Sequence, residues 1–196
     1  MIKSYGIDFA RLEDGEFDAP LGMATGAGDI FGITGGVMEA TLRTAVEKLT
    51  QGTVERLDFT EVRQVGGLRE ASVKLGNRTI NVAVANGLQN AKTILDRVTR
   101  GEKQYHMIEV MACPGGCSGG GGQPYPPYGG YVLDPRLIEK RGQALYTIDA
   151  AKKLRRSHEN PAVKKIYEEF LDHPGSPKAR ELLHSHYAAR LPRGIK

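Results

Sequence analysis

Hydrophobic and polar positions follow two different periods along the chain. Apolar residues first recur at spacings of three and four, which predicts an amphipathic helix from Val37 to near Gly52. Two runs of strict alternation follow and predict a β-hairpin that turns at Gly76-Asn77. The periodic positions are Met38, Leu42, Val46 and Leu49 in the helix, then Ala71, Val73, Leu75, Ile80, Val82 and Val84 in the hairpin.

A second helix and a third strand come next. Apolar residues from Leu88 to Val98 mark one helix face, which Gly101 ends, and the stretch 104–111 is typical of a strand with its apolar part at Met107–Met111. Strand, helix and strand at this spacing form a βαβ unit. Because open α/β sheets bind ligands beyond the carboxyl ends of their strands, the residues after Met111 lie where a ligand site is expected.

The two ends of the chain show different patterns. Residues 1–24 lack periodicity and indicate loop, and the glycines that follow (26, 28, 32, 35 and 36) indicate a flexible approach to the first helix. After a connector rich in Pro, Tyr and Gly at 124–131, three helices are predicted over 135–156, 161–171 and 176–187.

The pattern therefore predicts an α/β fold: a βαβ-containing lobe with glycine-rich loops, followed by C-terminal helices that wrap its outside. We divide the chain into residues 1–131 and a helical segment, 132–196. The 196 residues are 40% apolar and 26% charged, which is ordinary for a globular protein. No apolar stretch approaches the roughly 20 residues that a membrane helix needs. Two cysteines and no visible secretory signal favour reduced thiols and a cytoplasmic location.

Charge is distributed unevenly along the chain. Residues 151–196 hold 11 Lys and Arg and five Asp and Glu, a net charge of +6, so residues 1–150 carry −2. A basic third can contact nucleic acid, but no recognition motif accompanies it. We therefore expect no nucleic-acid partner and favour a solvated helical face, or a surface that docks onto an acidic partner subunit.

Both cysteines lie in one loop with little side-chain bulk, which runs from Met111 to Pro124. Cys113 and Cys117 are four residues apart and are surrounded by glycine, so backbone N–H groups can approach their sulfurs closely. This arrangement suits a soft metal centre or an iron–sulfur cluster. A short-loop disulfide or redox pair and an inert glycine linker are the alternatives. The five histidines are scattered and form no convincing metal site.

A second glycine-rich loop, Phe31–Val37, comes just before a predicted helix. The N–H groups and the dipole at a helix start favour an anion. We expect this loop to face the cysteine loop across a shared cavity, so that an anionic cluster meets thiolates on one side and helix N–H groups on the other. A phosphate site is less favoured for two reasons. No Gly-Lys-Ser or Gly-Lys-Thr follows the loop, and Gly26-Ala27-Gly28 lacks the glycine at position 31 that a dinucleotide-binding fingerprint would have.

The amino-acid sequences of these two loops are unusual. The run 29–40 reads Asp-Ile-Phe-Gly-Ile-Thr-Gly-Gly-Val-Met-Glu-Ala and is followed by Leu-Arg-Thr at 42–44; the run 111–117 reads Met-Ala-Cys-Pro-Gly-Gly-Cys, with Gly-Gly-Gly-Gln-Pro at 120–124. Together they closely resemble the catalytic subunit of [FeFe]-hydrogenases. The resemblance runs nearly the whole length, and the motifs at 157–161 and 182–187 are similar to the family's small-subunit-type segment.

The resemblance implies a cofactor and a set of residues around it. Cys113 and Cys117 would ligate the [4Fe-4S] cubane of the H-cluster, with the Cys117 sulfur bridging to the two-iron subsite. Met111 would pack its thioether near the two-iron unit. The loop residues Phe31, Gly32 and Val37 would line the pocket.

One departure matters as much as the match. The family holds its cubane with four cysteines, and its Thr-Ser-Cys-Cys-Pro and Met-Pro-Cys motifs have no counterpart in this sequence. The resemblance therefore implies the C-terminal half of a hydrogenase catalytic domain, which would work with a partner polypeptide carrying the other two cysteines, and with other redox subunits, in reversible proton reduction to H2. We expect the face beside Cys113 and Phe31 to be apolar or glycine-rich. A non-catalytic scaffold, assembly or truncated protein is the main alternative, and a phosphate-binding α/β protein a weaker one; no side chain is assigned as catalytic.

Overall fold

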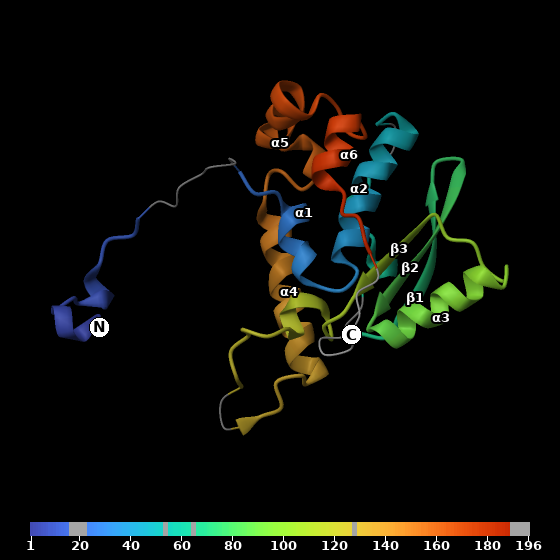
Figure 1. Cartoon of the computed structure of the whole chain (residues 1–196). Helices are drawn as coiled ribbons and strands as arrows, with labels where there is room; N and C mark the ends of the chain where they lie inside the picture. The colour runs from blue at the N-terminus through green and yellow to red at the C-terminus, as the bar shows by residue number, and fades with distance from the viewer. Residues whose placement is uncertain (16–22, 53–54, 64–65, 127–128, 189–196) are drawn as a thin grey trace.

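The computed structural model describes residues 1–15, 23–52, 55–63, 66–126 and 129–188. In this part of the chain three strands form one sheet in the order β1-β2-β3 (Figure 1). The strands are β1, Leu68–Leu75; β2, Arg78–Asn86; and β3, Met107–Met111. β1 and β2 form the predicted antiparallel hairpin, and β2 and β3 run parallel, joined by helix α3, Leu88–Thr99. The βαβ unit is therefore confirmed.

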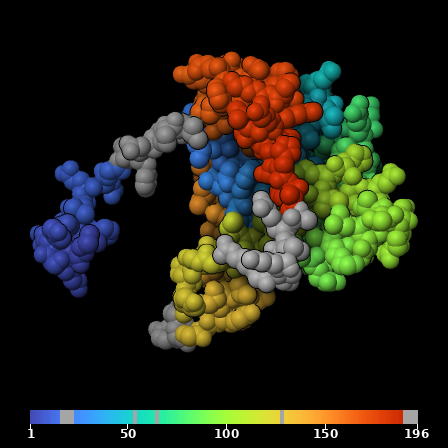
Figure 2. Space-filling view, viewed as in Figure 1, coloured from blue at the N-terminus to red at the C-terminus, as the bar shows by residue number. Residues whose placement is uncertain are grey.

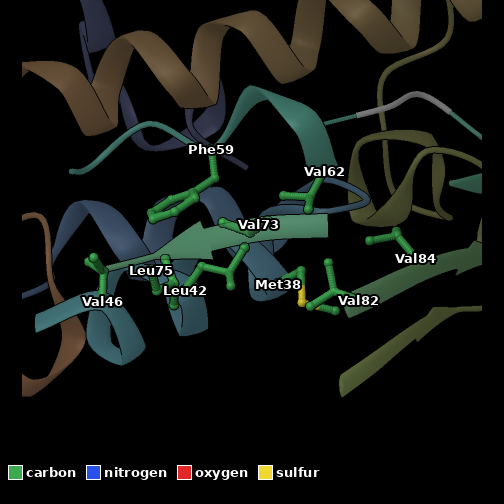
Figure 3. Packing of buried hydrophobic residues seen from close by; sticks show 9 residues of the cluster. All are labelled: Met38, Leu42, Val46, Phe59, Val62, Val73, Leu75, Val82 and Val84. Atoms are coloured by element: carbon green, nitrogen blue, oxygen red, sulfur yellow. The ribbon is translucent and has the colours of Figure 1, made fainter. Parts of the chain in front are cut away.

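Helix α2, Gly36–Thr50, packs on one face of the sheet because its apolar stripe fits the alternating residues of the hairpin. Figure 3 shows this core, in which every labelled side chain is buried. Its nine members are Met38, Leu42, Val46, Phe59, Val62, Val73, Leu75, Val82 and Val84. Helix α3 covers the opposite face and buries Ala91 and Ile94 against Ala83 and Ala85 of β2. The sheet is thus sandwiched between helices, as its two apolar faces require.

The C-terminal helices lie outside this α/β lobe (Figure 1). They are α4, Pro135–Ala151; α5, Pro161–Ile166, extended by a π-helical turn at Tyr167–Leu171; and α6, Pro177–Leu183. Proline at the first helical position and side-chain caps from Asp134, Asn160 and Ser176 begin each of them. The wrapping expected from the sequence is confirmed.

Two helix boundaries and one loop were predicted wrongly. The helix expected over 135–156 ends at Ala151, because the chain turns there and brings Arg155 back to Asp149 at 2.7 Å. The helix expected over 176–187 ends at Leu183. The glycine-rich approach is ordered as helix α1, Gly26–Asp29, and a 3-10 turn, η3, at Ile30–Gly32.

A buried ion network joins α2 to the segment around α4. Arg43 is fully buried, and its guanidinium donates to Asp149 at 2.7 and 2.8 Å and to Glu39 at 3.0 Å. Arg63 also binds Glu39, and Arg155 also binds Asp149, so each buried carboxylate meets two guanidinium groups. The pKa of Asp149 is affected by burial, which alone would raise it, but the hydrogen bonds from Arg43 and Arg155 outweigh burial and lower it. The C-terminal segment is thereby fixed to the lobe by charge as well as by packing.

The first 15 residues stand apart from the rest of the molecule (Figures 1 and 2). All of them are exposed, among them the apolar Ile2, Tyr5, Phe9 and Leu12. Two short 3-10 turns, at Lys3–Tyr5 and Phe9–Arg11, interrupt the loop predicted here. The part of that loop at 16–22, positions 127–128 of the connector and the end of the C-terminal segment at 189–196 lie outside the described residues. No described helix is long and apolar enough to cross a membrane.

Candidate cluster site

The cysteine loop begins where β3 ends, at the carboxyl edge of the sheet. Cys113 and Cys117 are exposed, and both thiols are free, so the disulfide alternative is not what the structure shows. The loop closes on itself through two hydrogen bonds of 3.0 Å, from Gly116 N–H to the Cys113 carbonyl and from Gly120 N–H to the Cys117 carbonyl. Between them the 3-10 turn η5, Gly116–Gly119, carries Cys117. The fold thus presents two accessible sulfurs on one short, closed loop.

The second glycine-rich loop lies directly against the first. Thr34 N–H donates to the Gly115 carbonyl at 3.1 Å. A Cβ on Gly116 would lie 2.9 Å from Thr34 N and 3.0 Å from the Gly32 carbonyl oxygen, and the φ of Gly116 is +85°. Glycine is therefore required at position 116 both by the left-handed backbone and by the close contact. The two loops lie at the same edge of the sheet, as the βαβ interpretation predicted.

Asn86, the last residue of β2, ties both loops to the sheet. Its Nδ2 donates to the Cys113 carbonyl at 2.5 Å and lies 3.2 Å from Thr34 Oγ1 and 3.4 Å from the Met111 carbonyl. The side chain is buried, with 8% of its surface exposed. Asn86 was not among the predicted site residues, although an amide that directly follows the apolar run Val82–Ala85 is a recognisable signal.

Glu109 occupies the start of helix α2, where an anion was expected. Its carboxylate accepts hydrogen bonds of 2.6 Å from the N–H groups of Gly35 and Met38. Burial raises the pKa of Glu109, and the two N–H donors oppose that rise. The expectation that the N–H groups of this helix start face a bound cluster is therefore wrong for these two donors, because β3 brings an internal carboxylate to them. The phosphate alternative loses the same two donors.

Helix α4 packs against both glycine-rich loops. Arg141 donates to the Ser118 carbonyl at 3.0 Å and to the Pro124 carbonyl at 2.8 Å. A Cβ on Gly119 would lie 3.0 Å from Ile138 Cδ1, and one on Gly32 would lie 2.9 Å from Leu145 Cδ1. The glycines of both loops therefore allow this helix to approach the backbone closely.

Two hollows adjoin the cysteines. The larger, of about 460 Å³, is lined by Val37, residues 107–113 including Met111 and Cys113, Gly116 and Cys117. The smaller, of about 330 Å³, is lined by Gly32, Cys117, Ser118, Gln123, Arg141, Ala144 and Leu145. Val37 and Met111 thus share one hollow with both cysteines, and Gly32 shares the other with Cys117. Phe31 lines neither hollow and is 45% exposed on the same loop.

The donor set fits part of an iron–sulfur cluster. Thiolates are the normal ligands of a cubane, and Cys113 and Cys117 supply two of the four it needs. Elsewhere in the described chain Glu47, His158 and Glu159 lie close enough to hold an ion. Arg156 already lies 2.9 Å from Glu159 and 3.4 Å from Glu47, so those carboxylates have a cation. The cysteine loop is the better candidate metal site.

Comparison with known proteins agrees with this placement. The model of the C-terminal domain of the iron-only hydrogenase large subunit matches residues 1–121, and that of the iron hydrogenase small subunit matches residues 135–190. The NADP-reducing hydrogenase subunit HndD of Solidesulfovibrio fructosivorans is 52% identical over 97% of this chain and 32% of its own length. Protein NAR1 of Arabidopsis thaliana is 35% identical over 95% of this chain and 40% of its own length.

Solved structures show the same relationship. The [FeFe]-hydrogenase HydA1 from Chlamydomonas reinhardtii is 41% identical and superposes with a TM-score of 0.66, covering 96% of this chain and 53% of that one. The chain thus spans about a third of the length of the curated relatives it matches and about half of the solved structures. Family models, relatives and fold agree: the chain belongs to the iron hydrogenase family, as a C-terminal part of its catalytic domain.

Proposed function

We propose that this chain supplies two of the four cysteine ligands of the active-site cluster of an [FeFe]-hydrogenase, and that the enzyme reversibly reduces protons to H2. Cys113 and Cys117 would hold one side of the [4Fe-4S] cubane, and a two-iron subsite would complete the H-cluster. The observation that carries this proposal is the pair of free, exposed thiols on one closed loop at the sheet edge, in a chain of this family. When bound, the cluster would supply electron transfer and the site of hydrogen chemistry.

The neighbouring residues have distinct parts in this proposal. Val37 and Met111 would wall the cluster, because they line the same hollow as the two cysteines. Gly32 would let Leu145 and the cysteine loop pack closely beside Cys117. Phe31 would complete the wall only when a second polypeptide covers this face, since 45% of it is exposed.

A partner polypeptide is part of the same proposal. Two thiolates leave two irons of a cubane without protein ligands, so the remaining cysteines would come from a second chain, with other redox subunits beyond it. The larger hollow, which is lined mostly by apolar residues, supports a covered face here. Residues 1–131 would contribute the cluster loops, and residues 132–196 the supporting helices. We place the enzyme in the cytoplasm from its cysteine usage; the relatives carry both cytosolic and periplasmic names.

The test is to purify the tagged full chain anaerobically from its own host and to measure native mass, iron, sulfide and H2 turnover. We expect iron only in the fraction that also holds a second polypeptide. Cys113→Ser and Cys117→Ser should each lower iron per complex and abolish turnover, whereas Lys140→Gln, an exposed residue of α4 that lines neither hollow, should do neither. A full cubane with turnover in the isolated chain would contradict the shared site.

A second candidate function is iron–sulfur cluster assembly or scaffolding without hydrogen turnover. It is favoured by relatives named NAR1 and probable cytosolic Fe-S cluster assembly factor, which are 35% and 36% identical to this chain. The same purification separates the two candidates. A complex that carries a cubane but lacks the two-iron unit and gives no H2 turnover would favour assembly.

A further inference from the structure

Helix α4 reaches the cysteine loop through one charged side chain. Arg141 donates from Nη1 to the Ser118 carbonyl and from Nη2 to the Pro124 carbonyl, at 3.0 and 2.8 Å. These two carbonyls flank the run of four glycines at 119–122. A guanidinium is a rigid planar fork, so it sets the separation and orientation of the two carbonyls it binds. Arg141 therefore bridges the two sides of the glycine run, and we call this pair of hydrogen bonds the Arg141 bracket.

The glycine run lies beside the first cysteine. A Cβ on Gly120 would lie 3.6 Å from Cys113 Sγ, so the backbone at Gly120 passes directly by the sulfur. Nothing lies within 4 Å of the Cβ positions of Gly121 and Gly122. Glycine loses more backbone entropy on ordering than any other residue. Gly119 is buried and the Gly120 N–H bonds the Cys117 carbonyl, whereas Gly121 and Gly122 pack against nothing, so the Arg141 bonds to Ser118 and Pro124 hold the chain on both sides of this unpacked part.

The same guanidinium brings charge to the second cysteine. Arg141 and Cys117 line the smaller hollow together, along with Gln123 and Leu145. Among the residues that line this hollow, Arg141 is the one that carries a charge. An arginine stays protonated at all working pH values, so this is a permanent positive charge in a partly enclosed space. Charge near an iron–sulfur cluster is one of the factors that set its reduction potential.

We propose that Arg141 is a positioning residue of the cluster site: its fork holds the glycine run against the cysteines, and its charge raises the reduction potential of the cluster. The first part stands on the hydrogen bonds alone, whereas the second rests on the proposed function. Arg141 lies within residues 135–190, which the small-subunit family model matches. The helical segment would then contribute to the cluster site itself as well as to the outside of the fold.

The first part is tested by hydrogen exchange on the full chain without iron. Arg141→Gln and Arg141→Lys both lose the planar fork, and Lys140→Gln, the exposed neighbour on α4, is the matched control. We expect the Gly120 amide, bonded to the Cys117 carbonyl, to exchange at least about tenfold faster in both Arg141 variants and unchanged in the control. Circular dichroism confirms that each variant is folded. Unchanged exchange at Gly120, or an equal rise throughout the β-sheet, would overturn the positioning role.

The second part is tested on the iron-loaded complex by redox titration followed by electron paramagnetic resonance. Arg141→Gln should lower the midpoint potential, Arg141→Lys should keep it nearer to the wild-type value, and Lys140→Gln should leave it unchanged. Equal potentials in Arg141→Gln and wild type would overturn the electrostatic role. If no complex with this chain binds a cluster, the proposed function fails. The hydrogen-exchange result still decides whether Arg141 positions the glycine run.

Discussion

Arg43 gives the sharpest test of how the C-terminal segment is held to the lobe. In Arg43→Met the apolar stem is kept and the guanidinium is removed. Five hydrogen bonds disappear, among them those to Asp149 at 2.7 and 2.8 Å, to Glu39 at 3.0 Å and to the Leu57 carbonyl at 2.7 Å. Removing one partner of a buried ion pair costs about 3–5 kcal/mol, because the other charge stays buried.

The surrounding charges place the expected cost at the lower end of that range. Asp149 keeps Arg155 at 2.7 Å, and Glu39 keeps Arg63 at 2.6 Å, so neither carboxylate is left without a cation. We therefore expect the free energy of unfolding to fall by about 3 kcal/mol. This is a large fraction of the roughly 5–15 kcal/mol typical of a folded domain.

The assay is urea unfolding of the full chain, followed by far-ultraviolet circular dichroism. The matched control is Arg100→Met, whose side chain is 62% exposed and pairs with Glu102 on the surface; its cost should stay below about 1 kcal/mol. A double-mutant cycle with Asp149→Asn should show a coupling above about 0.5 kcal/mol. If Arg43→Met costs no more than Arg100→Met, the network does not hold the segment and the reasoning is wrong.

Three further predictions concern the site and its surroundings. Gly116→Ala should destabilise the chain by more than about 1 kcal/mol, since φ is +85° and Thr34 N is 2.9 Å from the new Cβ, whereas Gly121→Ala, with open space, should be nearly neutral by the same urea assay. Asn86→Ala should cost about 1–3 kcal/mol and speed amide exchange at Thr34, and an Asn86→Ala chain with unchanged exchange would contradict the tie between the loops. The hydrogen bond from Arg56 lowers the pKa of Glu61, so its stabilisation should be present above pH 4.5 and vanish as the pH falls below it; the stability gap between wild type and Glu61→Gln, of at most about 1 kcal/mol, should close in urea titrations at low pH.

Much of the fold follows from local pattern. The helix from Val37, the hairpin at Gly76-Asn77 and the strand at Met107–Met111 are all where periodicity predicted them, because each buries one apolar face. The end of α4 did not follow from pattern. There the chain turns and brings Arg155 back to Asp149, which also binds Arg43, 106 residues away in the chain, and charge contacts of this kind leave no periodic signal.

Some residues of the candidate site could likewise be predicted from the sequence, and others could not. Both cysteines and the adjoining loop could be found from composition, and their shared sheet edge from the βαβ topology. Glu109 could not, because in sequence it reads as one polar position on a strand, and only the approach of β3 to α2 makes it the cap of that helix at 2.6 Å. The helix start at which a ligand was predicted is occupied by the Glu109 carboxylate.

That filled helix start changes how the site can be understood. With the N–H groups of Gly35 and Met38 held by Glu109, the second loop meets the cysteine loop through Thr34 and its glycines. The positive charge in the hollow beside Cys117 then comes from Arg141, a permanent cation on a helix outside the lobe. The positive charge at the site is therefore provided by the C-terminal segment, through Arg141 of α4, and not by the N-terminus of α2 in the lobe. A chain cut before α4 would therefore keep both cysteines and lose the bracket and the charge that organise them.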